Sequence, residues 1–369
     1  MGERINIEGE EKIGVDTERE KCPSCGSNLV FDPESKSLYC EHCGTKIKIE
    51  QGETAKELNL IDGFDKDGKD NAWDQGEATV FSCDNCGAKV VLKKGQTAES
   101  CPFCGTAHVV KTEELPGLKP NGLLPFAFGL EKAVEYAKNW AKKRFFAPRK
   151  FKKSIKTDNV NGVYMPCFTF DSSTYTTYTA MLGKTKTRTV GSGKDRRTET
   201  YTEWRTVSGD WSTRFDDVLV TAGSKFGQNQ LDKVSPYETN SGVMYDEKYM
   251  LGYMAYHYDR DLEDCWGSAK SVMDAEIERQ VLSQYSYDVV GSFNASTAHS
   301  GVTYKYVMLP VYLGNYKYAK KFYNFFVNGR TGKVAGKTPV SFWKVLLVVL
   351  GGIALAALIG YIIYLTSLE

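Results

Sequence analysis

The sequence contains little histidine, almost no net charge and no phosphate-binding glycine loop. It has 4 histidines in 369 residues, and its 47 lysines and arginines are balanced by 46 aspartates and glutamates. Balanced charge argues against a chain that binds nucleic acid through a generally basic surface. No dinucleotide-binding glycine motif and no arrangement of serine, histidine and aspartate can be recognised either. We therefore expect a protein that is not an enzyme and has no catalytic residues.

The sequence also lacks an apolar stretch ahead of its cysteines. Residues 1–20 contain no hydrophobic run of the kind that a signal peptide needs, so we expect the ten cysteines to stay in a reducing cytosol. Eight of the ten lie between residues 22 and 104. The other two, Cys167 and Cys265, are expected to be packed thiols rather than nucleophiles.

The eight clustered cysteines form four Cys-x-x-Cys doublets, each followed by a glycine. Two thiolates at this spacing can bind one metal ion when the chain turns tightly around it, and glycine permits the positive φ of such a turn. The same number of residues, 14, separates the two doublets of each pair. We predict two structural four-cysteine zinc ribbons with Zn²⁺ as the cofactor. Their ligands are Cys22, Cys25, Cys40 and Cys43 in the first ribbon and Cys83, Cys86, Cys101 and Cys104 in the second.

Two alternatives to zinc are open for these cysteines. The doublet from Cys101 to Cys104 is by itself similar to a redox-active dithiol. A redox enzyme, however, needs one doublet at the start of a helix, whereas four doublets here share one glycine-terminated form. Iron in a rubredoxin-like site would use the same four thiolates. Metal analysis of the protein distinguishes all three.

The charge is divided unevenly along the chain. Residues 1–120 hold 15 Lys and Arg against 23 Asp and Glu, a net charge of −8, which leaves +9 for residues 121–369. A zinc ion with four thiolates would add about two further negative charges at each site. Because phosphate binding needs clustered Lys and Arg, we expect the ribbons to bind cytosolic or membrane proteins rather than nucleic acid.

The C-terminal region contains 21 consecutive residues without a charge, at 345–365. A helix of this length spans roughly 31 Å, which matches the hydrocarbon core of a bilayer. The alternative is a buried core helix, but such helices rarely run this long without a polar residue. Lysine and arginine precede the segment and none follows it, so we expect a tail-anchored, single-pass protein of the cell membrane with its N-terminal bulk in the cytoplasm. Gly352, Ala356 and Gly360 recur every four residues and would allow close helix packing in a homo-oligomer.

The central region combines one basic helix with many strands. Residues 130–146 have the spacing of an amphipathic helix, and basic side chains cover its end and the residues after it. These side chains, which include Lys142, Lys143, Arg144, Lys152 and Lys153, form either a solvated surface or a contact with anionic lipid headgroups. Tyr, Thr, Phe and Val then predict strands at 163–170, 175–190, 197–207, 218–221, 304–318 and 321–327, and a second helix is predicted at 268–285. Segments 164–170 and 308–314 are alike, with Pro166 matching Pro310, which indicates a duplicated α+β unit.

These features predict a multi-domain protein with two small four-cysteine zinc ribbons, a β-rich α+β region and one C-terminal transmembrane helix. The predicted parts are an N-terminal tail at 1–20, zinc ribbon 1 at 21–50, a linker with a short helix at 51–77, zinc ribbon 2 at 78–110, a linker at 111–128, α+β units at 129–250 and 251–340, and the transmembrane helix at 345–365.

The order of motifs resembles a known group of proteins. Beside the twin cysteine modules, the resemblance rests on residues 118–126, 146–148, 162–166, 215–220, 309–311 and 327–333. The chain is similar to bacterial membrane-anchored proteins with a TFIIB-type zinc ribbon, which are sometimes labelled primosomal or helicase-like. Some relatives are similar to membrane partners of the phage-shock-protein-A stress system. The resemblance implies a scaffolding role in envelope stress. It assigns no catalytic residue to this chain. The missing phosphate-binding loop argues against a helicase motor.

Two functions follow from these observations. The first is a tail-anchored membrane adaptor whose cytoplasmic zinc ribbons dock protein partners in a membrane-stress assembly. The alternative is a membrane-tethered zinc-ribbon protein that binds nucleic acid. Salt-sensitive binding of nucleic acid by residues 1–120 would favour the alternative.

Overall fold

The architecture comes from a computed structural model, which describes residues 21–50, 52–64, 78–93, 101, 103, 109–111, 118–318 and 321–366. The expected N-terminal tail at 1–20, parts of both expected linkers and the metal ligand Cys104 lie outside these residues. Within them the chain is a multi-domain α+β protein with one apolar C-terminal helix, as predicted.

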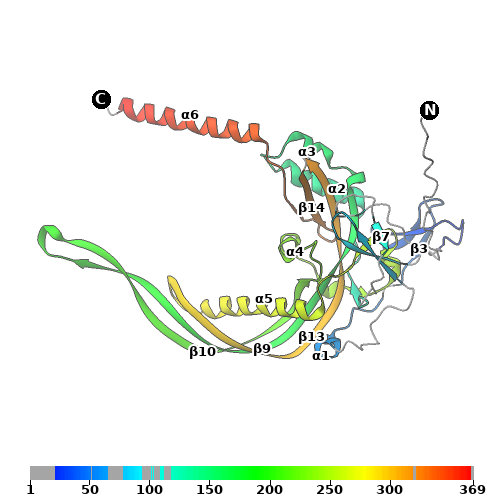
Figure 1. The fold of residues 1–369 in the computed structure, drawn as a ribbon, viewed down its shortest axis with the longest axis horizontal. Helices are drawn as coiled ribbons and strands as arrows, with labels where there is room; N and C mark the ends of the chain where they lie inside the picture. The colour runs from blue at the N-terminus through cyan, green and yellow to red at the C-terminus, as the bar shows by residue number, and fades with distance from the viewer. Residues whose placement is uncertain are drawn as a thin grey trace, which may run out of the picture.

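Two long strands, β9 and β13, form the centre of the protein (Figure 1). They run antiparallel and pair with each other over most of their lengths, while β10 pairs with the other side of β9 and β14 with the other side of β13. β15 then adds to β14. Their bounds are β9 (Val160–Val190), β10 (Arg197–Thr221), β13 (Val289–Tyr318), β14 (Lys321–Asn328) and β15 (Val334–Gly336). The strands predicted at 163–170 and 175–190 are one strand, because pairing with β10 and β13 holds the polar residues between them, 171–174, in the extended chain.

A short parallel strand pairs with each of the two long strands. β8 (Gly122–Leu123) runs parallel to β13 at Val307 and Met308, and β12 (Met254–Tyr256) runs parallel to β9 at Val163 and Tyr164. Val163 and Val307 stand three residues before Pro166 and Pro310. β8 comes from the segment predicted as a linker at 111–128, and the pairing of β9 with β13 joins the predicted units 129–250 and 251–340 in one sheet.

The outer parts of β9, β10 and β13 extend as a long curved arm from the rest of the sheet and the helices that cover it, which together form the body (Figure 1). The β9–β10 hairpin closes at Gly191 and Gly193, whose φ values of 93° and 61° are costly for other residues. α5 (Leu262–Leu282) lies along the concave side of the arm. One face of α5 is buried there, with members that include Cys265, Ala269, Met273, Ile277 and Val281. Asp261 accepts a hydrogen bond from the Asp264 amide and begins this helix six residues earlier than predicted.

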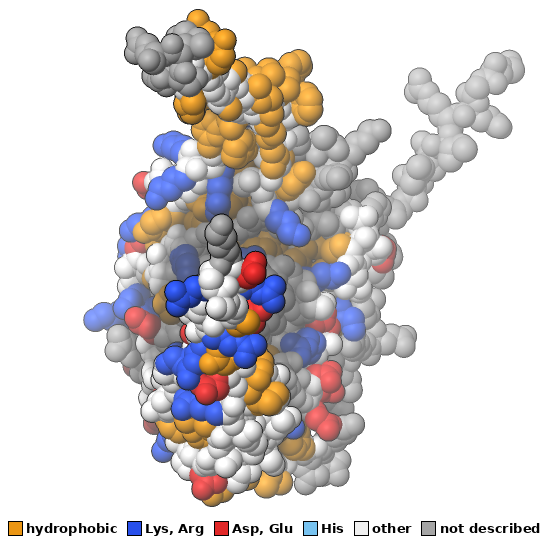
Figure 2. Space-filling view, turned by 90° about the vertical axis from the view of Figure 1, so that its left-hand side faces the viewer, with side chains coloured by type: hydrophobic (Ala, Val, Ile, Leu, Met, Phe, Trp, Pro, Cys, Tyr) orange, Lys and Arg blue, Asp and Glu red, His pale blue; other side chains and the backbone are white. Residues whose placement is uncertain are grey.

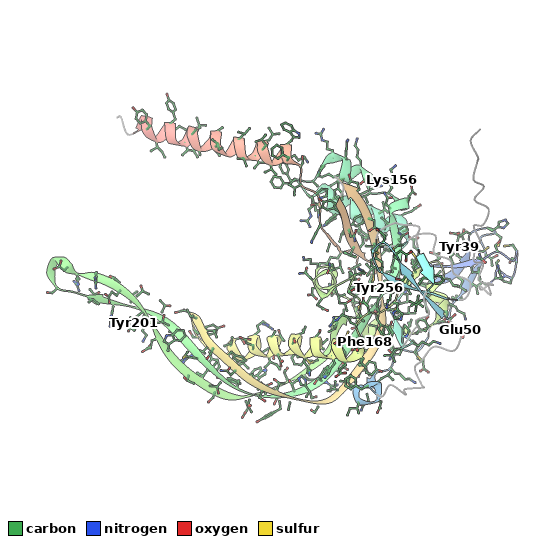
Figure 3. The ribbon with its side chains drawn as sticks, in the orientation of Figure 1. Tyr39, Glu50, Lys156, Phe168, Tyr201 and Tyr256 are labelled. Carbon is green, nitrogen blue, oxygen red and sulfur yellow. The ribbon has the colours of Figure 1, made fainter. Side chains whose placement is uncertain are left out.

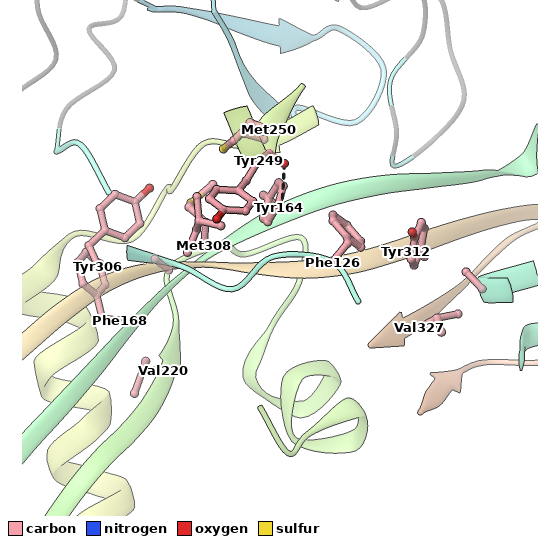
Figure 4. Close-up of a cluster of buried hydrophobic side chains, with 14 of the residues drawn as sticks. Phe126, Tyr164, Phe168, Val220, Tyr249, Met250, Tyr306, Met308, Tyr312 and Val327 are labelled. Atoms are coloured by element: carbon pink, nitrogen blue, oxygen red, sulfur yellow. Dashed lines mark hydrogen bonds between the residues drawn. The ribbon is translucent and has the colours of Figure 1, made fainter. Parts of the chain in front are cut away.

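Aromatic side chains fill the core where β8, β9 and β13 meet (Figure 4). The Phe126 ring contacts Tyr164 at 5.0 Å and Tyr312 at 4.7 Å between centroids. Both tyrosine hydroxyls are buried and donate to backbone carbonyls, Tyr164 to Tyr249 at 3.1 Å and Tyr312 to Phe128 at 2.5 Å. Because each of these two hydroxyls has a partner, the two tyrosines add aromatic area to the core and leave neither hydroxyl unsatisfied.

The remaining helices cover the sheet. They are α1 (Leu60–Phe64), α2 (Leu130–Lys142), α3 (Arg149–Ser154) and α4 (Gln228–Val234), with single-turn helices at Thr157–Asn159, Gly193–Asp195, Thr239–Ser241 and Glu247–Met250. α2 buries Ala133, Val134, Ala137 and Ala141, so the amphipathic helix predicted at 130–146 is present and ends at Lys142. Pro148 lies just beyond it and begins α3.

The cysteine modules occupy the end of the body that lies away from the arm (Figure 1). The first is a separate sheet of β1 (Leu29–Asp32), β2 (Ser37–Cys40) and β3 (Lys46–Lys48). The second contributes β5 (Ala78–Cys83), β6 (Lys89–Lys93) and β7 (Val109–Lys111) to the main sheet. Two further short strands, β4 (Leu58–Asn59) and β11 (Val243–Met244), pair with β13 and β8.

The C-terminal helix α6 (Phe342–Thr366) projects from the body (Figure 1). Its segment Phe342–Tyr364 has 23 residues and a mean hydropathy of 2.7, and none of its apolar window is buried inside the protein. The helix is therefore long and apolar enough to cross a membrane, and the alternative of a buried core helix is wrong for this structure. Figure 2 shows its continuous hydrophobic surface.

Candidate metal centres

The first cysteine module brings all four predicted ligands together. The Sγ atoms of Cys22, Cys25, Cys40 and Cys43 lie within 4.8 Å of one another. Gly26 and Gly44 follow the two doublets with φ of 73° and 78°, and their amides donate to the carbonyls of Cys22 and Cys40 at 2.8 Å. Glycine is suited to this conformation because a side chain would be strained at these φ values. The predicted turn after each doublet is confirmed.

The spacing of the sulfur atoms fits a tetrahedral metal site. Cys22 and Cys43 are separated by 3.5 Å between Sγ atoms, as are Cys25 and Cys40. Four sulfurs at the usual zinc–sulfur length of about 2.3 Å would be about 3.8 Å apart. The cluster is therefore slightly tighter than a zinc site and can hold one metal ion with a small outward movement of its thiolates.

The protonation of these thiols also favours a shared cation. Hydrogen bonds from the hydroxyl and amide of Ser27 lower the pKa of Cys25 to about 5. The Cys43 amide acts in the same direction on Cys40, but burial and the neighbouring thiols of Cys25 and Cys43 outweigh it and raise the pKa of Cys40 to about 11. The buried Cys40 thiol thus resists ionisation beside its neighbours. A divalent ion removes this conflict because it binds the thiolate form.

The second module repeats this geometry. The Sγ atoms of Cys83, Cys86 and Cys101 lie within 4.8 Å of one another, and Cys86 and Cys101 are 3.6 Å apart. Gly87 has a φ of 68°, and its amide donates to the Cys83 carbonyl at 2.7 Å, as in the first module. Cys104, the fourth predicted ligand, lies outside the described residues. Both modules are thus cysteine clusters that can bind a metal ion.

Both modules are fixed to the body through residues 247–257, which the sequence pattern did not indicate. In the first module, the Phe31 amide donates to the Leu251 carbonyl at 2.9 Å, and the Phe31 ring contacts Tyr249 edge-on at 5.1 Å. In the second, β6 pairs with β12 and Phe103 contacts Tyr256 at 4.9 Å. Figure 3 shows Tyr39 in the first module and Tyr256 inside the body. The modules are therefore held in fixed positions on one body.

The other predicted site residues lie on α2, on α3 and on α6, outside the cysteine modules. Lys142, Lys143 and Arg144 are exposed at the end of α2, while Lys152 and Lys153 lie on α3. Gly352, Ala356 and Gly360 are exposed on α6, and a methyl group added at either glycine would meet no described atom within 4 Å. The proposed packing stripe on α6 is thus unobstructed.

A partly buried charged cluster lies where β9, β10 and β13 meet, and it includes carboxylates that the sequence pattern alone would assign to a solvated loop. Carboxylate oxygens of Glu57, Asp171 and Asp216 lie within 4.8 Å of one another. The Lys305 ammonium is beside them and forms ion pairs with Asp217 at 2.7 Å and Glu57 at 3.5 Å. Burial alone would lower the pKa of Lys305, but its hydrogen bond to Asp217 and the surrounding carboxylates raise it. Lys305 already supplies a positive charge here, so the cluster is an ion-pair network rather than a third metal site.

One serine–histidine pair and the two isolated cysteines have buried nucleophilic atoms. Ser172 and His299 are hydrogen-bonded at 3.0 Å, but Ser172 is only 1% exposed and pairs across the sheet. Cys167 and Cys265 are fully buried, and burial raises the pKa of Cys265 to about 12 and that of Cys167 further. They are packed thiols, as predicted.

We expect neither Cys167 nor Cys265 to react with N-ethylmaleimide in the native, metal-loaded protein at neutral pH. Both thiols are inaccessible and protonated, and the thiolate is the reactive form. Mass spectrometry of tryptic peptides measures the labelling. Treatment with a chelator should expose the ligand cysteines first, and guanidinium should expose all ten. Rapid native labelling of Cys167 would contradict the burial.

Comparison with known proteins gives one informative match. The chain is 31% identical over 326 residues to "Uncharacterized protein YdjG" of Bacillus subtilis strain 168, and the match covers 88% of this chain and 91% of that protein. The chain belongs to the same family as YdjG. No protein-family profile matches the chain. No solved structure matches it.

Proposed function

We propose that this member of the YdjG family is a tail-anchored membrane adaptor whose zinc ribbons dock other proteins at the cytoplasmic face. The observation that carries the proposal is the combination, in one chain, of two metal-type cysteine clusters and an unburied apolar helix that projects from the body. The TFIIB-type ribbon family named above has the same combination. The cluster geometry supports Zn²⁺ as the ion at both sites.

Charge around α6 supports the proposed orientation. Arg330, Lys333, Lys337 and Lys344 precede or begin the helix. Lysine and arginine are retained on the cytoplasmic side of a membrane span. The cysteine modules would then lie in the cytosol, and Figure 1 places them on the side of the body away from the C-terminal end of α6.

Charge also supports proteins as the partners of the ribbons. The net charge of −8 over residues 1–120 would become about −12 if each site held zinc with four thiolates. Such a region repels phosphate groups and attracts basic protein surfaces. A membrane-stress assembly of the phage-shock kind is the setting that we propose, with self-association through α6 as an additional contact.

The proposal is tested by isolating the full-length, tagged protein from its host after mild crosslinking. We expect a protein partner that is recovered with the wild type and lost with Cys22→Ser/Cys25→Ser, because the first ribbon then loses two ligands. The matched control, Cys167→Ala/Cys265→Ala, changes two cysteines that are not ligands and should retain the partner. Equal recovery from both variants would refute docking by the first ribbon, and nuclease-sensitive recovery of DNA or RNA would favour the nucleic-acid alternative.

A further inference from the structure

The start of α6 is attached to the turn between α2 and α3. The Ser341 amide donates to the Phe146 carbonyl at 2.8 Å. The Lys344 ammonium donates to the carbonyls of Phe145 and Ala147, both at 2.8 Å. These contacts join segments that are far apart in the sequence. Wherever α6 enters a membrane, the α2–α3 turn is therefore at the point of entry.

The same turn exposes aromatic side chains beside α6. Phe145 is 63% exposed and Phe146 41%, and at the start of α6 Phe342 and Trp343 are 71% and 72% exposed. Large apolar side chains seldom gather in water without a partner surface. Aromatic rings at the end of a membrane span instead match the headgroup layer, where both apolar and polar surroundings are available.

The charge around these rings has a single sign. Residues 136–157 contain nine Lys and Arg and no Asp or Glu. The exposed members in α2, the turn and α3 include Lys142, Lys143, Arg144, Arg149, Lys150 and Lys153. Figure 3 labels Lys156, which follows α3, at the same end of the body, and Figure 2 shows Lys and Arg side chains around the base of the apolar helix.

The arm limits how the body can face a bilayer. In Figure 1 the arm and α6 leave the body in the same direction, and the arm extends beyond the end of α6. The arm is polar, with exposed ion pairs such as Lys186 with Glu203 and Arg188 with Glu199. Because charged groups cannot enter hydrocarbon at low cost, α6 must turn away from the arm when it spans a membrane. A bend of α6 after Lys344 would keep these contacts and leave the start of the helix beside the α2–α3 turn.

We propose that residues 142–153 form a second membrane contact, in which Phe145 and Phe146 insert into the headgroup layer and the surrounding lysines and arginines bind anionic lipids. This surface holds the body in one orientation, with the cysteine modules directed away from the bilayer. The inference rests on the proposed anchoring by α6 and adds a lipid specificity to it. Each basic side chain near an anionic surface contributes about a fivefold factor to membrane partitioning.

Photocrosslinking of the full-length protein in vesicles tests this contact. A benzophenone amino acid replaces Phe145, and the vesicles contain phosphatidylcholine alone or with about 30% phosphatidylglycerol, which gives a strongly anionic surface. We expect lipid adducts at position 145 by mass spectrometry, with a yield at least about fivefold higher in the anionic vesicles. The matched control is the same substitution at Tyr201, an aromatic residue of the arm that is 41% exposed. It should give no lipid adduct.

A third position separates the failure of this inference from the failure of anchoring. The photoreactive group at Leu355, in the middle of α6, should form lipid adducts in both kinds of vesicle. Adducts at 355 without any at 145 would overturn the second contact and leave the anchor intact, whereas no adducts at 355 would overturn the anchor itself. Adducts of position 145 with another copy of the protein would identify this surface as a protein interface instead.

Removal of charge provides an independent measurement. A quadruple variant replaces four exposed lysines by glutamine: Lys142→Gln, Lys143→Gln, Lys150→Gln and Lys153→Gln. In anionic vesicles its adduct yield at position 145 should fall to the yield measured in neutral vesicles. Arg144 and Lys152 are left unchanged because they contact the Trp140 ring and the Lys142 carbonyl. The control neutralises the exposed Lys184, Lys186, Arg188 and Arg197 of the arm and should leave the yield unchanged. An equal loss in both variants would show a nonspecific effect of net charge and overturn the assignment to residues 142–153.

Discussion

Replacing Cys40 by serine is expected to remove one of two metal ions from each chain and to unfold the β1–β3 sheet. Cys40 is completely buried, and its Sγ lies 3.5 Å from that of Cys25. Serine cannot supply the thiolate that a zinc site of this kind requires. Structural zinc contributes roughly 10–16 kcal/mol of apparent binding free energy to folding, so a module this small would lose its ordered state with its metal.

Atomic emission measures the metal content of the purified full-length protein, and hydrogen exchange measures the order of residues 21–50. We expect about two zinc ions for the wild type, one for Cys40→Ser and two for the control Cys265→Ser, which changes a buried cysteine outside both clusters. Iron in place of zinc would support the rubredoxin-like alternative. Metal-free protein with disulfide-linked doublets would overturn the zinc proposal in favour of redox chemistry.

Lys305→Met is expected to reduce the free energy of unfolding by about 3–5 kcal/mol, the usual result of breaking a buried ion pair. The Lys305 side chain is 6% exposed and that of Asp217 is 8% exposed. Methionine fills a similar volume but leaves Asp171 and Asp217 buried beside each other without a cation. Since the folded protein raises the pKa of Lys305 above its unfolded value, the contribution is complete at neutral pH and declines only as pH rises through the lysine range.

Guanidinium unfolding of the full-length protein in detergent, followed by near-ultraviolet circular dichroism, measures this change. The control is the double variant Lys305→Met/Asp217→Asn, because asparagine tolerates the left-handed backbone of Asp217, φ 52°, and removes the uncompensated charge. We expect the double variant to regain part of the lost stability. A loss below about 1 kcal/mol for Lys305→Met would show that water reaches this cluster and screens the carboxylates.

The features that the sequence predicted best are those whose geometry is local. A Cys-x-x-Cys-Gly segment forms its own turn, so the positive φ of Gly26, Gly44 and Gly87 followed from five consecutive residues. α2 followed from its apolar spacing. The lengths of strands were harder to predict, because the threonine-rich part of β9 is polar on its own and is extended only when β10 and β13 pair with both of its edges.

The cluster around Lys305 could not be predicted, because its members come from distant parts of the chain. Glu57 precedes α1, Asp171 lies on β9 and Asp217 occupies an irregularity in β10. None of these residues has a sequence pattern that distinguishes it from a solvated surface charge. The pairing of β9 with β10 and β13 brings Asp171 and Asp217 to Lys305, and the pairing of β4 with β13 brings Glu57 there.

The sequence by itself determined which groups can bind a metal and which segment can enter a membrane, since both depend on residue type and short-range spacing. The tertiary structure decided where these groups stand. Phe31 and β6 attach the cysteine modules to residues 247–257, while Ser341 and Lys344 attach the start of α6 to the α2–α3 turn. Such contacts join side chains and backbone groups from unrelated segments. These contacts can form, and stabilise the protein, only after the long strands have paired. No local sequence pattern therefore predicts them.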